Sequence, residues 1–437
     1  RRALKYGMSK QFLKPYGDFL GTRKWKWIDD LTLTMSNGQR CFFTHGRSAE
    51  VIKVSQAQSM STVQGHYHTK FTISYWANSD NIFWAMNVGC LINQKNRMLK
   101  KRILITGGGG YLGSVIVPHL IKKGYQVTVI DRFFFGNSLP KNNKNLVIKQ
   151  KDVRDLKKKD FQNIYAVIDL VSISNDPAGE YFKKETNEIN FLSRVRNAKL
   201  SKSSGVNRYI LPSSCSIYGF QDAIVDEDSQ VNPLTTYAKA NYRAEKGVLN
   251  LADNKFTVTV IRQATVFGYS PRMRFDLAIN GMTEGAINTK YLPLMRNGNQ
   301  IRPLVHVKDV ARCMEFFLKV DSMIVNKKIY NLGSSKCTTT IKQLGKFVKN
   351  VLGENIRIKW YGDPDHRSYN VSFKKLEKIG FKTLYDIPYG IKEIRDKIYT
   401  KVISKELKTM TLDWYKYLEK ANKIINDVSV NQKILKL

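Results

Sequence analysis

The stretch RILITGGGGYLG, residues 102–113, begins with a run of β-prone apolar residues and ends in closely spaced glycines. An amphipathic run follows it as far as Gly124, so the stretch predicts a strand, a tight turn and the start of a helix. Gly107, Gly110 and Gly113 have the spacing GxxGxxG. The first two allow a sharp turn and let backbone N–H groups approach a pyrophosphate, while the third lets helix and strand pack closely. The positive end of the helix dipole would then face the phosphates.

From Lys101 onward, short β-prone runs alternate with amphipathic helical ones. Further strands are predicted in YQVTVID (125–131), YAVIDLVS (165–172), RYILPSS (208–214) and FTVTVIRQ (256–263). Such alternation implies right-handed βαβ crossovers and a parallel, doubly wound sheet. We therefore predict an α/β fold with a Rossmann core over about residues 98–265.

Three further segments complete the predicted organisation. A smaller substrate lobe above the carboxyl ends of the strands is expected mainly from about residues 266–390. The Lys-rich residues 391–437 are expected to form a helical tail. Met98 opens MLKKRILITGGGGYLGS like a natural chain start, so a domain boundary is expected near residue 97. Residues 1–97 are then a β-rich partial domain fused to the rest.

A carboxylate at the end of the second predicted strand indicates which dinucleotide the turn would bind. Asp131 lies 18 residues beyond Gly113, near the distance at which an acidic residue reaches the ribose hydroxyls of adenosine. Its charge repels a 2′-phosphate, so NAD is favoured over NADP. Arg132 beside it, and Tyr111 and Leu112 within the turn, are further cofactor-binding candidates.

Composition argues for an ordinary folded protein. Lys and Arg number 72 against 36 acidic residues, a formal charge of +36 over 437 residues. The basic residues are spread from end to end without interleaved aromatics, so nucleic-acid binding is not expected, although a basic surface would attract an anionic substrate. Five cysteines form no CxxC pair and no apolar run is long enough to cross a membrane. We therefore expect a reduced, cytoplasmic protein without a membrane partner.

Histidines end two β-prone runs of the first segment. They are His45 in CFFTHG and His66 and His68 in GHYHT, and two histidines separated by one residue at a strand end can both turn toward one metal ion. These motifs resemble the C-terminal part of the calcineurin-like metallophosphoesterases, where such histidines complete a two-metal centre. The upstream Asp-x-His, Gly-Asp and Gly-Asn-His elements of that family are absent from this chain. The resemblance therefore implies a truncated, vestigial metal site rather than two-metal hydrolysis.

Four motifs accompany the glycine turn in the second segment. They are DVRD (152–155), PSSCSIYG (212–219), YAKAN (237–241) and RPLVHVKDVA (302–311). In this order they resemble the extended short-chain dehydrogenase/reductases, specifically the NAD-dependent nucleotide-sugar epimerase/dehydratase family. The resemblance covers about residues 98–390 and does not specify the sugar. It implies NAD as the cofactor, a nucleotide sugar as the substrate and a homodimer.

The resemblance assigns roles to residues at matching positions. Asp152 and Val153 would border the adenine of the cofactor. Ser214 would hydrogen-bond the sugar hydroxyl that is oxidised, and Tyr237 would be the acid/base.

Three residues are implied on the substrate side. Arg302, and Arg367 in DHRSYNV, resemble the arginines that grip the substrate diphosphate, a task that suits the guanidinium fork. Asn280 resembles a substrate-contacting asparagine. For both arginines an ordinary surface charge is the alternative.

Asn241 departs from the family pattern, in which lysine stands four residues after the tyrosine. Removing a hydride from a sugar carbon requires a base for its hydroxyl proton, and tyrosine, with a pKa of about 10, needs a nearby cation to serve as one. Asparagine carries no charge, Lys239 is expected on the opposite side of the helix, and Tyr242 with Lys246 are expected at the surface. The site must therefore work through water or another cation brought in by the fold, with activity reduced rather than lost.

The residues after Ser214 narrow the reaction. Family dehydratases carry an acidic pair there, whereas this chain has Cys215 and Ser216, neither of which is a suitable general acid at neutral pH. Epimerisation, or simple oxidation and reduction, at the sugar C4 is therefore favoured over dehydration. Two alternatives stay open: an NAD-binding protein without turnover, because of Asn241, and a metal-dependent phosphoesterase resting on the three histidines.

Overall fold

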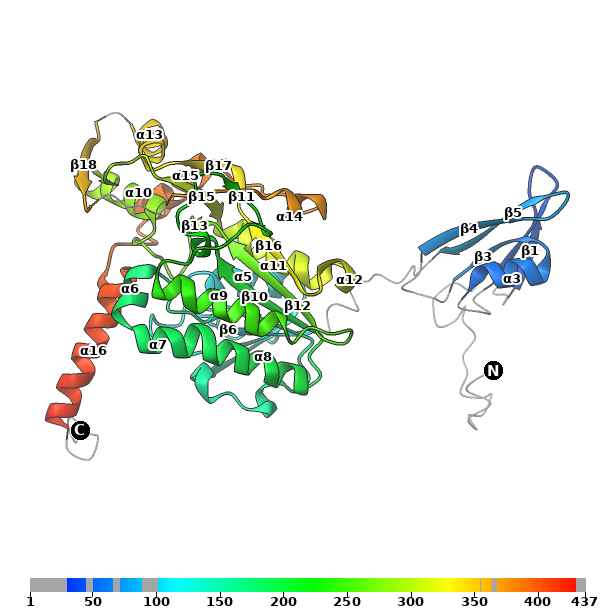
Figure 1. Cartoon of the computed structure of the whole chain (residues 1–437), viewed down its shortest axis with the longest axis horizontal. Coiled ribbons are helices and arrows are strands. Elements are labelled where there is room, and N and C mark those ends of the chain that lie inside the picture. The colour runs from blue at the N-terminus through cyan, green and yellow to red at the C-terminus, as the bar shows by residue number, and fades with distance from the viewer. Residues whose placement is uncertain are drawn as a thin grey trace. The chain divides into compact units, whose positions relative to one another are not determined.

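The chain folds as two compact units, Arg1–Asn96 and Arg97–Leu437. The computed structural model describes residues 30–44, 50–65, 71–88, 101–353, 355–363 and 368–429 (Figure 1). None of the helices in these ranges is long and apolar enough to cross a membrane.

The first unit contains a five-stranded sheet in the order β1-β2-β3-β5-β4. Its elements are β1 (Asp30–Thr34), β2 (Arg40–Thr44), α3 (Val51–Gln58), β3 (Ser61–Gln64), β4 (Phe71–Ala77) and β5 (Ile82–Val88). The helix is tied to the sheet where Trp76 Nε1 donates to Ser55 Oγ at 2.8 Å. Inside the sheet, the amide of Gln64 donates to Asn87 Oδ1 at 2.9 Å. The predicted β-rich region is confirmed.

The predicted metal ligands of this unit, His45, His66 and His68, lie outside the described residues. Among the residues that are described, no group of three or more His, Cys, Asp or Glu side chains is placed to hold a metal ion. The vestigial metal site stays a prediction.

The second unit is built on a seven-stranded sheet in which all neighbouring strands are parallel, in the order β16-β12-β10-β9-β6-β7-β8. The strands are β6 (Arg102–Thr106), β7 (Gln126–Asp131), β8 (Leu146–Gln150), β9 (Ala166–Asp169), β10 (Arg208–Ser214), β12 (Thr257–Gln263) and β16 (Lys328–Leu332). The chain runs outward from β6 to β8 and then returns to β9, so the strand order reverses between β6 and β9. Ligand crevices of open α/β sheets form at such a reversal. The predicted doubly wound sheet is confirmed.

Helices cover both faces of this sheet. One face carries α5 (Gly113–Lys122) and α11 (Val307–Lys319), and the other carries α8 (Arg194–Ser203) and α9 (Thr236–Leu249). Successive strand residues face opposite sides, so Ile103 and Ile105 join the first core cluster while Leu104 joins the second. Pro118 lies inside α5 without ending it. Figure 1 shows α8 and α9 side by side over the sheet.

A smaller lobe has its own core at the carboxyl ends of the strands. It contains β13 (Thr265–Phe267), α10 (Ala278–Thr289), β14 (Tyr291–Met295), β15 (Ile301–His306), β17 (Ser334–Thr340), α13 (Ile341–Leu352), β18 (Arg357–Tyr361) and α15 (Ile387–Tyr399). In Figure 1, α10, α13, α15 and β18 gather at one end of the unit. Within the range 266–390 expected to hold most of the lobe, α11 and β16 belong to the large sheet, where Met314 and Leu332 are fully buried.

Shorter elements connect these layers. They are η2 (Val153–Asp155), η3 (Lys158–Phe161), α6 (Asp176–Tyr181), α7 (Lys183–Asn187), η4 (Glu188–Ser193), η5 (Cys215–Tyr218), β11 (Ile224–Val225), α12 (Ser322–Val325), β19 (Asn370–Val371), α14 (Lys374–Lys378) and η6 (Leu407–Thr409). The described chain ends with α16 (Thr411–Val428), so the expected helical tail consists of much of α15 and all of α16.

Candidate active site

A cleft of about 1360 Å³ opens where the strand order reverses. It starts at the turn after β6, passes the carboxyl ends of β7 and β10, and reaches α10 in the small lobe. The cleft brings together residues that the sequence analysis named in six separate segments of the chain. Those that line it are Gly107, Gly110, Tyr111, Leu112, Asp131, Arg132, Asp152, Val153, Ser214, Tyr237 and Arg302.

The glycine turn brings bare backbone to the cleft. Gly107 has φ +71°, and a Cβ added there would lie 2.8 Å from the backbone nitrogen of Val171, so no other residue fits without strain. Gly113 was expected to let helix and strand pack closely, but its close approach is to Gly108, within the turn itself. Ser114 Oγ donates to the carbonyl of Gly110 at 2.8 Å and fixes the start of α5. The turn is thus shaped for a ligand that needs close backbone approach.

The Asp131 carboxylate is hydrogen-bonded to the glycine turn. Its Oδ2 accepts from the backbone N–H of Gly109 at 2.9 Å, and its Oδ1 accepts from that of Phe133 at 2.6 Å. Burial raises the pKa of the Asp131 carboxyl, and these two hydrogen bonds act against that rise. The carboxylate is therefore fixed in orientation at the end of β7.

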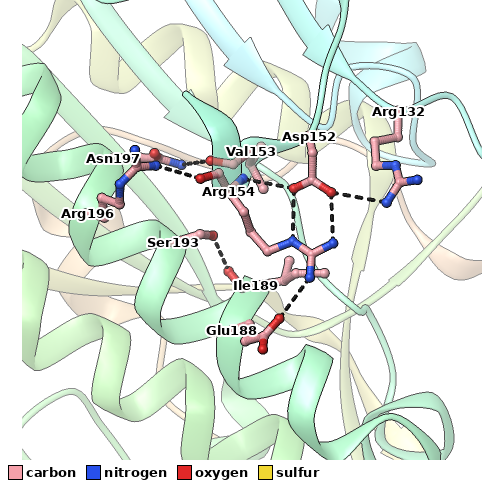
Figure 2. Close-up of polar contacts among 9 residues, drawn as sticks. All are labelled: Arg132, Asp152, Val153, Arg154, Glu188, Ile189, Ser193, Arg196 and Asn197. Atoms are coloured by element: carbon pink, nitrogen blue, oxygen red, sulfur yellow. Dashed lines mark hydrogen bonds and ion pairs between the residues drawn. The ribbon is translucent and has the colours of Figure 1, made fainter. Parts of the chain in front are cut away.

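Charged side chains are linked in a chain beside the cleft, whose lining includes Arg132, Asp152 and Arg154. Figure 2 shows the contacts among them. Asp152 Oδ2 accepts from Arg132 Nη1 at 3.1 Å and from Arg154 Nη2 at 2.9 Å. Arg154 Nη1 in turn donates to Glu188 Oε2 at 2.8 Å. Burial raises the pKa of Asp152, but hydrogen bonds from Arg154 outweigh it and leave that pKa lowered. Val153 is held beside this chain because its carbonyl accepts from Asn197 Nδ2 at 3.3 Å.

Tyr237 and Ser214 meet in the cleft from different elements. Tyr237 lies in the first turn of α9, whose start is fixed where Thr235 Oγ1 accepts from the N–H of Ala238 at 3.1 Å. Ser214 is the last residue of β10. Burial raises the pKa of the Tyr237 phenol, while the charge of Arg194 and a side-chain hydrogen bond with Ser214 lower it. A phenol and a hydroxyl so arranged can together bind one substrate hydroxyl and exchange its proton.

Asn241 is buried beneath Tyr237 rather than lining the cleft. Its Nδ2 donates to the carbonyl of Tyr237 at 2.9 Å, and its Oδ1 accepts from Arg194 Nη1 at 2.6 Å. Arg194 is itself 2% exposed and lines the cleft. Sequence reasoning missed Arg194, because it lies 47 positions before Asn241 and no local motif marks it.

The lysines near Tyr237 in sequence lie elsewhere. Lys239 is exposed, as expected from its position in α9. Lys246 is also exposed and lies 4.3 Å from the centre of the half-buried Tyr242 ring. Neither lysine lines the cleft.

Two serine hydroxyls beside Ser214 were also missed. Within the described chain, Ser213 Oγ and Ser216 Oγ are buried without a hydrogen-bond partner, and both residues line the cleft. Such buried hydroxyls are suited to a polar ligand that completes their bonding. Cys215 between them is fully buried, and burial raises the pKa of its thiol.

The residues expected on the substrate side have different surroundings. Arg302 lines the cleft and lies 5.7 Å from the centre of the Tyr369 ring. Asn280 is fully buried and is not among the cleft-lining residues, since its Oδ1 accepts from Gly268 N at 3.0 Å and its Nδ2 donates to Arg274 O at 2.9 Å. In this structure Asn280 therefore positions the loop before α10. Arg367 lies outside the described residues.

That loop contributes two buried arginines which no motif had marked. Arg274 pairs with Asp276 at 2.6 Å. Arg272 is 7% exposed, and its Nε and Nη1 have no hydrogen-bond partner within the described chain. Its guanidinium lies 3.6 Å from the centre of the Phe135 ring, and burial followed by the like charge of Arg274 lowers its pKa. A buried guanidinium that keeps two N–H groups without an acceptor in a cleft is a site for an anion.

Helix α16 forms a further wall of the cleft through Tyr415, Leu418 and Glu419. Trp414 Nε1 donates to the carbonyl of Phe134 at 2.6 Å, and the Tyr415 ring lies edge-on to Phe135 with centroids 5.3 Å apart. The tail therefore packs against the loop that follows Asp131.

Comparison with known proteins agrees with this geometry. The profile of the NAD dependent epimerase/dehydratase family matches residues 103–333. A putative UDP-glucose 4-epimerase of Methanocaldococcus jannaschii is 28% identical over 306 residues, covering 67% of this chain and 96% of that protein. UDP-glucuronic acid decarboxylase 1 of Xenopus tropicalis is 26% identical over 319 residues, covering 69% of this chain and 72% of that protein.

Solved structures show the same fold. The UDP-glucuronic acid 4-epimerase of Bacillus cereus, in complex with UDP-glucuronic acid and NAD, has a TM-score of 0.62 at 19% identity and covers 69% of this chain and 99% of its own. The UDP-glucose 4-epimerase of Thermotoga maritima with UDP-glucose has a TM-score of 0.61 at 22% identity and covers 69% and 100%.

Proposed function

Since the chain belongs to the NAD-dependent epimerase/dehydratase family, we propose that it is a nucleotide-sugar 4-epimerase, or a related oxidoreductase, acting at the sugar C4. The observation that carries this proposal is the pairing of Tyr237 with Ser214 in the cleft that starts at the glycine turn. Relatives named for UDP-sugar conversions support the same substrate class.

The residues of the cleft fit NAD. The N–H groups of Gly107, Gly109 and Gly110 already donate within the protein, so a pyrophosphate would be held by the N–H groups at the start of α5. Asp131 would hold the adenosine ribose, and Asp152 with Val153 would border the adenine. When bound, NAD⁺ would accept a hydride from the sugar carbon and, as NADH, would return that hydride to the carbonyl carbon.

Side chains of the protein would transfer the hydroxyl proton. Ser214 holds the C4 hydroxyl of the sugar and Tyr237 takes its proton, which leaves a 4-keto sugar. For epimerisation the keto sugar turns over in the cleft, and Tyr237 returns the proton when the C4 hydroxyl re-forms. The hydroxyls of Ser213 and Ser216, which have no hydrogen-bond partner within the described chain, would hydrogen-bond sugar oxygens.

The same surroundings argue against dehydration. Loss of a hydroxyl next to the keto group needs an acid to protonate it. Cys215 is fully buried with a raised pKa and does not line the cleft, and Ser216 is a hydroxyl that stays neutral. Simple epimerisation, or oxidation and reduction, is therefore the reaction that the site supports.

The test is a panel of nucleotide sugars incubated with the full chain and NAD⁺. UDP-glucose and UDP-glucuronic acid come first, followed by GDP-, CDP- and dTDP-sugars, with products separated by anion-exchange chromatography and identified by NMR. Conversion of one sugar to its C4 epimer supports the proposal. Tight NAD binding without any product from the panel would instead indicate the non-catalytic, NAD-binding alternative. The homodimer stays a prediction, which sedimentation of the full chain would test.

A further inference from the structure

We infer that Arg194, held in place by Asn241, supplies the positive charge beside Tyr237 that a lysine at position 241 would otherwise supply. The inference rests on the proposed role of Tyr237 as the acid/base. It makes Asn241 a positioning residue and explains how a site with this departure from the usual pattern keeps a usable base.

The placement of Arg194 begins with the helix that carries it. Helices α7, η4 and α8 run without a break, and η4 is a π-helical turn over Glu188–Ser193. A π turn changes the side-chain register of the residues that follow it and is frequent at functional sites. Arg194 is the first residue after this turn. Its side chain is buried and lines the cleft.

Three hydrogen bonds fix the guanidinium of Arg194. Its Nε and Nη2 donate to the carbonyl of Val171 at 3.2 and 2.8 Å, and its Nη1 donates to Asn241 Oδ1 at 2.6 Å. All of these acceptors are neutral. Within the residues that the structure describes, no carboxylate forms an ion pair with Arg194, so its charge is not cancelled at close range.

The bonding of Asn241 explains why an amide suits this position. An amide has both an acceptor and a donor, and Asn241 uses the acceptor for Arg194 and the donor for the carbonyl of Tyr237. A lysine here would offer only donors and a second positive charge against a buried arginine. Asparagine at 241 and arginine at 194 therefore form a matched pair.

The other charges around Tyr237 do not replace Arg194. Arg274 lowers the pKa of the phenol less than Arg194 does, and it is paired with Asp276 at 2.6 Å. Asp176 of α6 acts in the opposite direction and raises that pKa. Arg194 is thus the main charge that opposes the effect of burial on the phenol.

The experiment measures the phenol directly and needs no sugar substrate. The full chain is labelled with ¹³Cζ-tyrosine, and the Tyr237 resonance among 22 tyrosines is assigned by its absence from Tyr237→Phe. Its pKa is then followed by NMR titration, with and without NAD⁺. The variants are Arg194→Gln, Arg194→Lys, Asn241→Ala and the double variant Arg194→Gln/Asn241→Lys, which returns a cation to α9.

A matched control is Arg243→Gln. Arg243 is an exposed arginine of α9 whose Nη1 donates to Asn187 Oδ1 at 2.9 Å, and it does not line the cleft. We expect the phenol pKa to rise by about one pH unit or more in Arg194→Gln, as for the loss of a nearby opposite charge, and to stay unchanged in Arg243→Gln. Arg194→Lys keeps most of the effect, Asn241→Ala shows a smaller rise, and the double variant returns toward the original pKa.

Three results would overturn the inference. The first is a phenol pKa unchanged in Arg194→Gln. The second is a rise that the relocated lysine of the double variant does not reverse, which would make Arg194 merely structural. The third applies if Arg194→Gln fails to fold: an unchanged phenol pKa in Asn241→Ala would then decide against the inference.

Absence of sugar turnover would refute the proposed function and leave this titration valid. Where a sugar is turned over, the ascending limb of kcat against pH moves to higher pH in Arg194→Gln, since the base acts deprotonated.

Discussion

Burial and the proposed chemistry favour opposite protonation states of the Tyr237 phenol. Burial keeps its phenol protonated, whereas the proposed reaction needs the phenolate, so neighbours must favour the charged form. Ser214 does so by a hydrogen bond and Arg194 by its charge. The proposed acid/base would therefore depend on residues from β10 and α8 as much as on its own helix.

Replacing Tyr237 by phenylalanine separates chemistry from binding. Phenylalanine keeps the ring that packs at the start of α9 but has no proton to exchange. We expect kcat for the converted sugar to fall by about 10²- to 10⁴-fold, the usual contribution of a positioned acid/base. Steady-state kinetics gives kcat, and isothermal titration calorimetry checks that the Kd for NAD⁺ is retained. A variant that keeps full kcat would assign the proton transfer to another group.

Arg272 is expected to bind a phosphate of the cofactor. Its ring partner Phe135 belongs to the loop after β7, the strand that ends at Asp131, which places this cation on the NAD side of the cleft. A hydrogen bond to a charged group contributes about 1.5–3 kcal/mol, so Arg272→Gln should raise the Kd for NAD⁺ about tenfold or more. Arg272→Lys should restore it only in part, because an ammonium lacks the planar fork.

Calorimetric titrations of Arg272→Gln with NAD⁺ and with UDP, each alone, assign the anion. Arg395→Gln is the matched control, since Arg395 bonds Asp396 on α15 and does not line the cleft. Weaker binding of UDP with unchanged binding of NAD⁺ would move Arg272 to the substrate side.

At the scale of elements, one partly buried carboxylate in the middle of α15 bonds to residues at the end of β15 and the start of α11. Glu393 of α15 accepts from the backbone N–H of Tyr269 at 3.0 Å, contacts His306 Nε2 at 3.1 Å, and pairs with Lys308. Burial opposes its ionisation, but the hydrogen bonds from His306 and Lys308 prevail and lower the pKa of Glu393 to about 2. The carboxylate thus ties the small lobe to the start of α11.

Glu393→Gln should destabilise the second unit. Loss of this charged acceptor is expected to lower the free energy of unfolding by about 1–3 kcal/mol at neutral pH, measured by urea denaturation. A lowered folded-state pKa means that the stabilisation is complete above the unfolded pKa of about 4.3 and disappears as the pH falls toward about 2. The two chains should therefore converge in acid. Exposed Glu377→Gln, on α14, should match the unsubstituted chain throughout.

The elements themselves were largely predictable, and their long-range contacts were not. Strand and helix periods over 102–263 predicted the parallel sheet, and motif order predicted that Ser214 and Tyr237 act together. The role of Arg194 was not predicted, because a contact between side chains of two packed helices produces no pattern in the local sequence. Asn280 was assigned by motif resemblance to the substrate, yet burial of the loop before α10 gives its amide other partners.

On the scale of the whole second unit, the glycine turn, the small lobe and the tail enclose one cleft. Helix α16 of the tail lines this cleft. It lies beyond residue 333, where the match to the family ends. Its Tyr415 contacts Phe134 and Phe135 at centroid distances of 6.0 and 5.3 Å, and Glu419 Oε2 accepts from the hydroxyl of Tyr181 at 3.1 Å. The Tyr415 contacts cover the loop that follows Asp131, and the Glu419 contact joins α16 to α6.

Shortening the chain after Met410 should therefore loosen the cofactor. Aromatic pairs are worth about 0.5–1.5 kcal/mol each beyond the area they bury, and removing α16 deletes at least two of them. We expect the Kd for NAD⁺ to rise about tenfold, mainly through faster dissociation. Stopped-flow fluorescence measures the dissociation rate. A chain ending after Ser429 keeps α16 and serves as the control.

Tyr415→Ala in the full chain tests the aromatic ring that lines the cleft without removing the rest of α16. It should reproduce part of the change, because the ring supplies the contact with Phe135 while Trp414 still bonds the carbonyl of Phe134 at 2.6 Å. Equal dissociation rates in the shortened and control chains would show that α16 packs beside the cleft without holding the cofactor, and the glycine turn and Asp131 would then carry the binding by themselves.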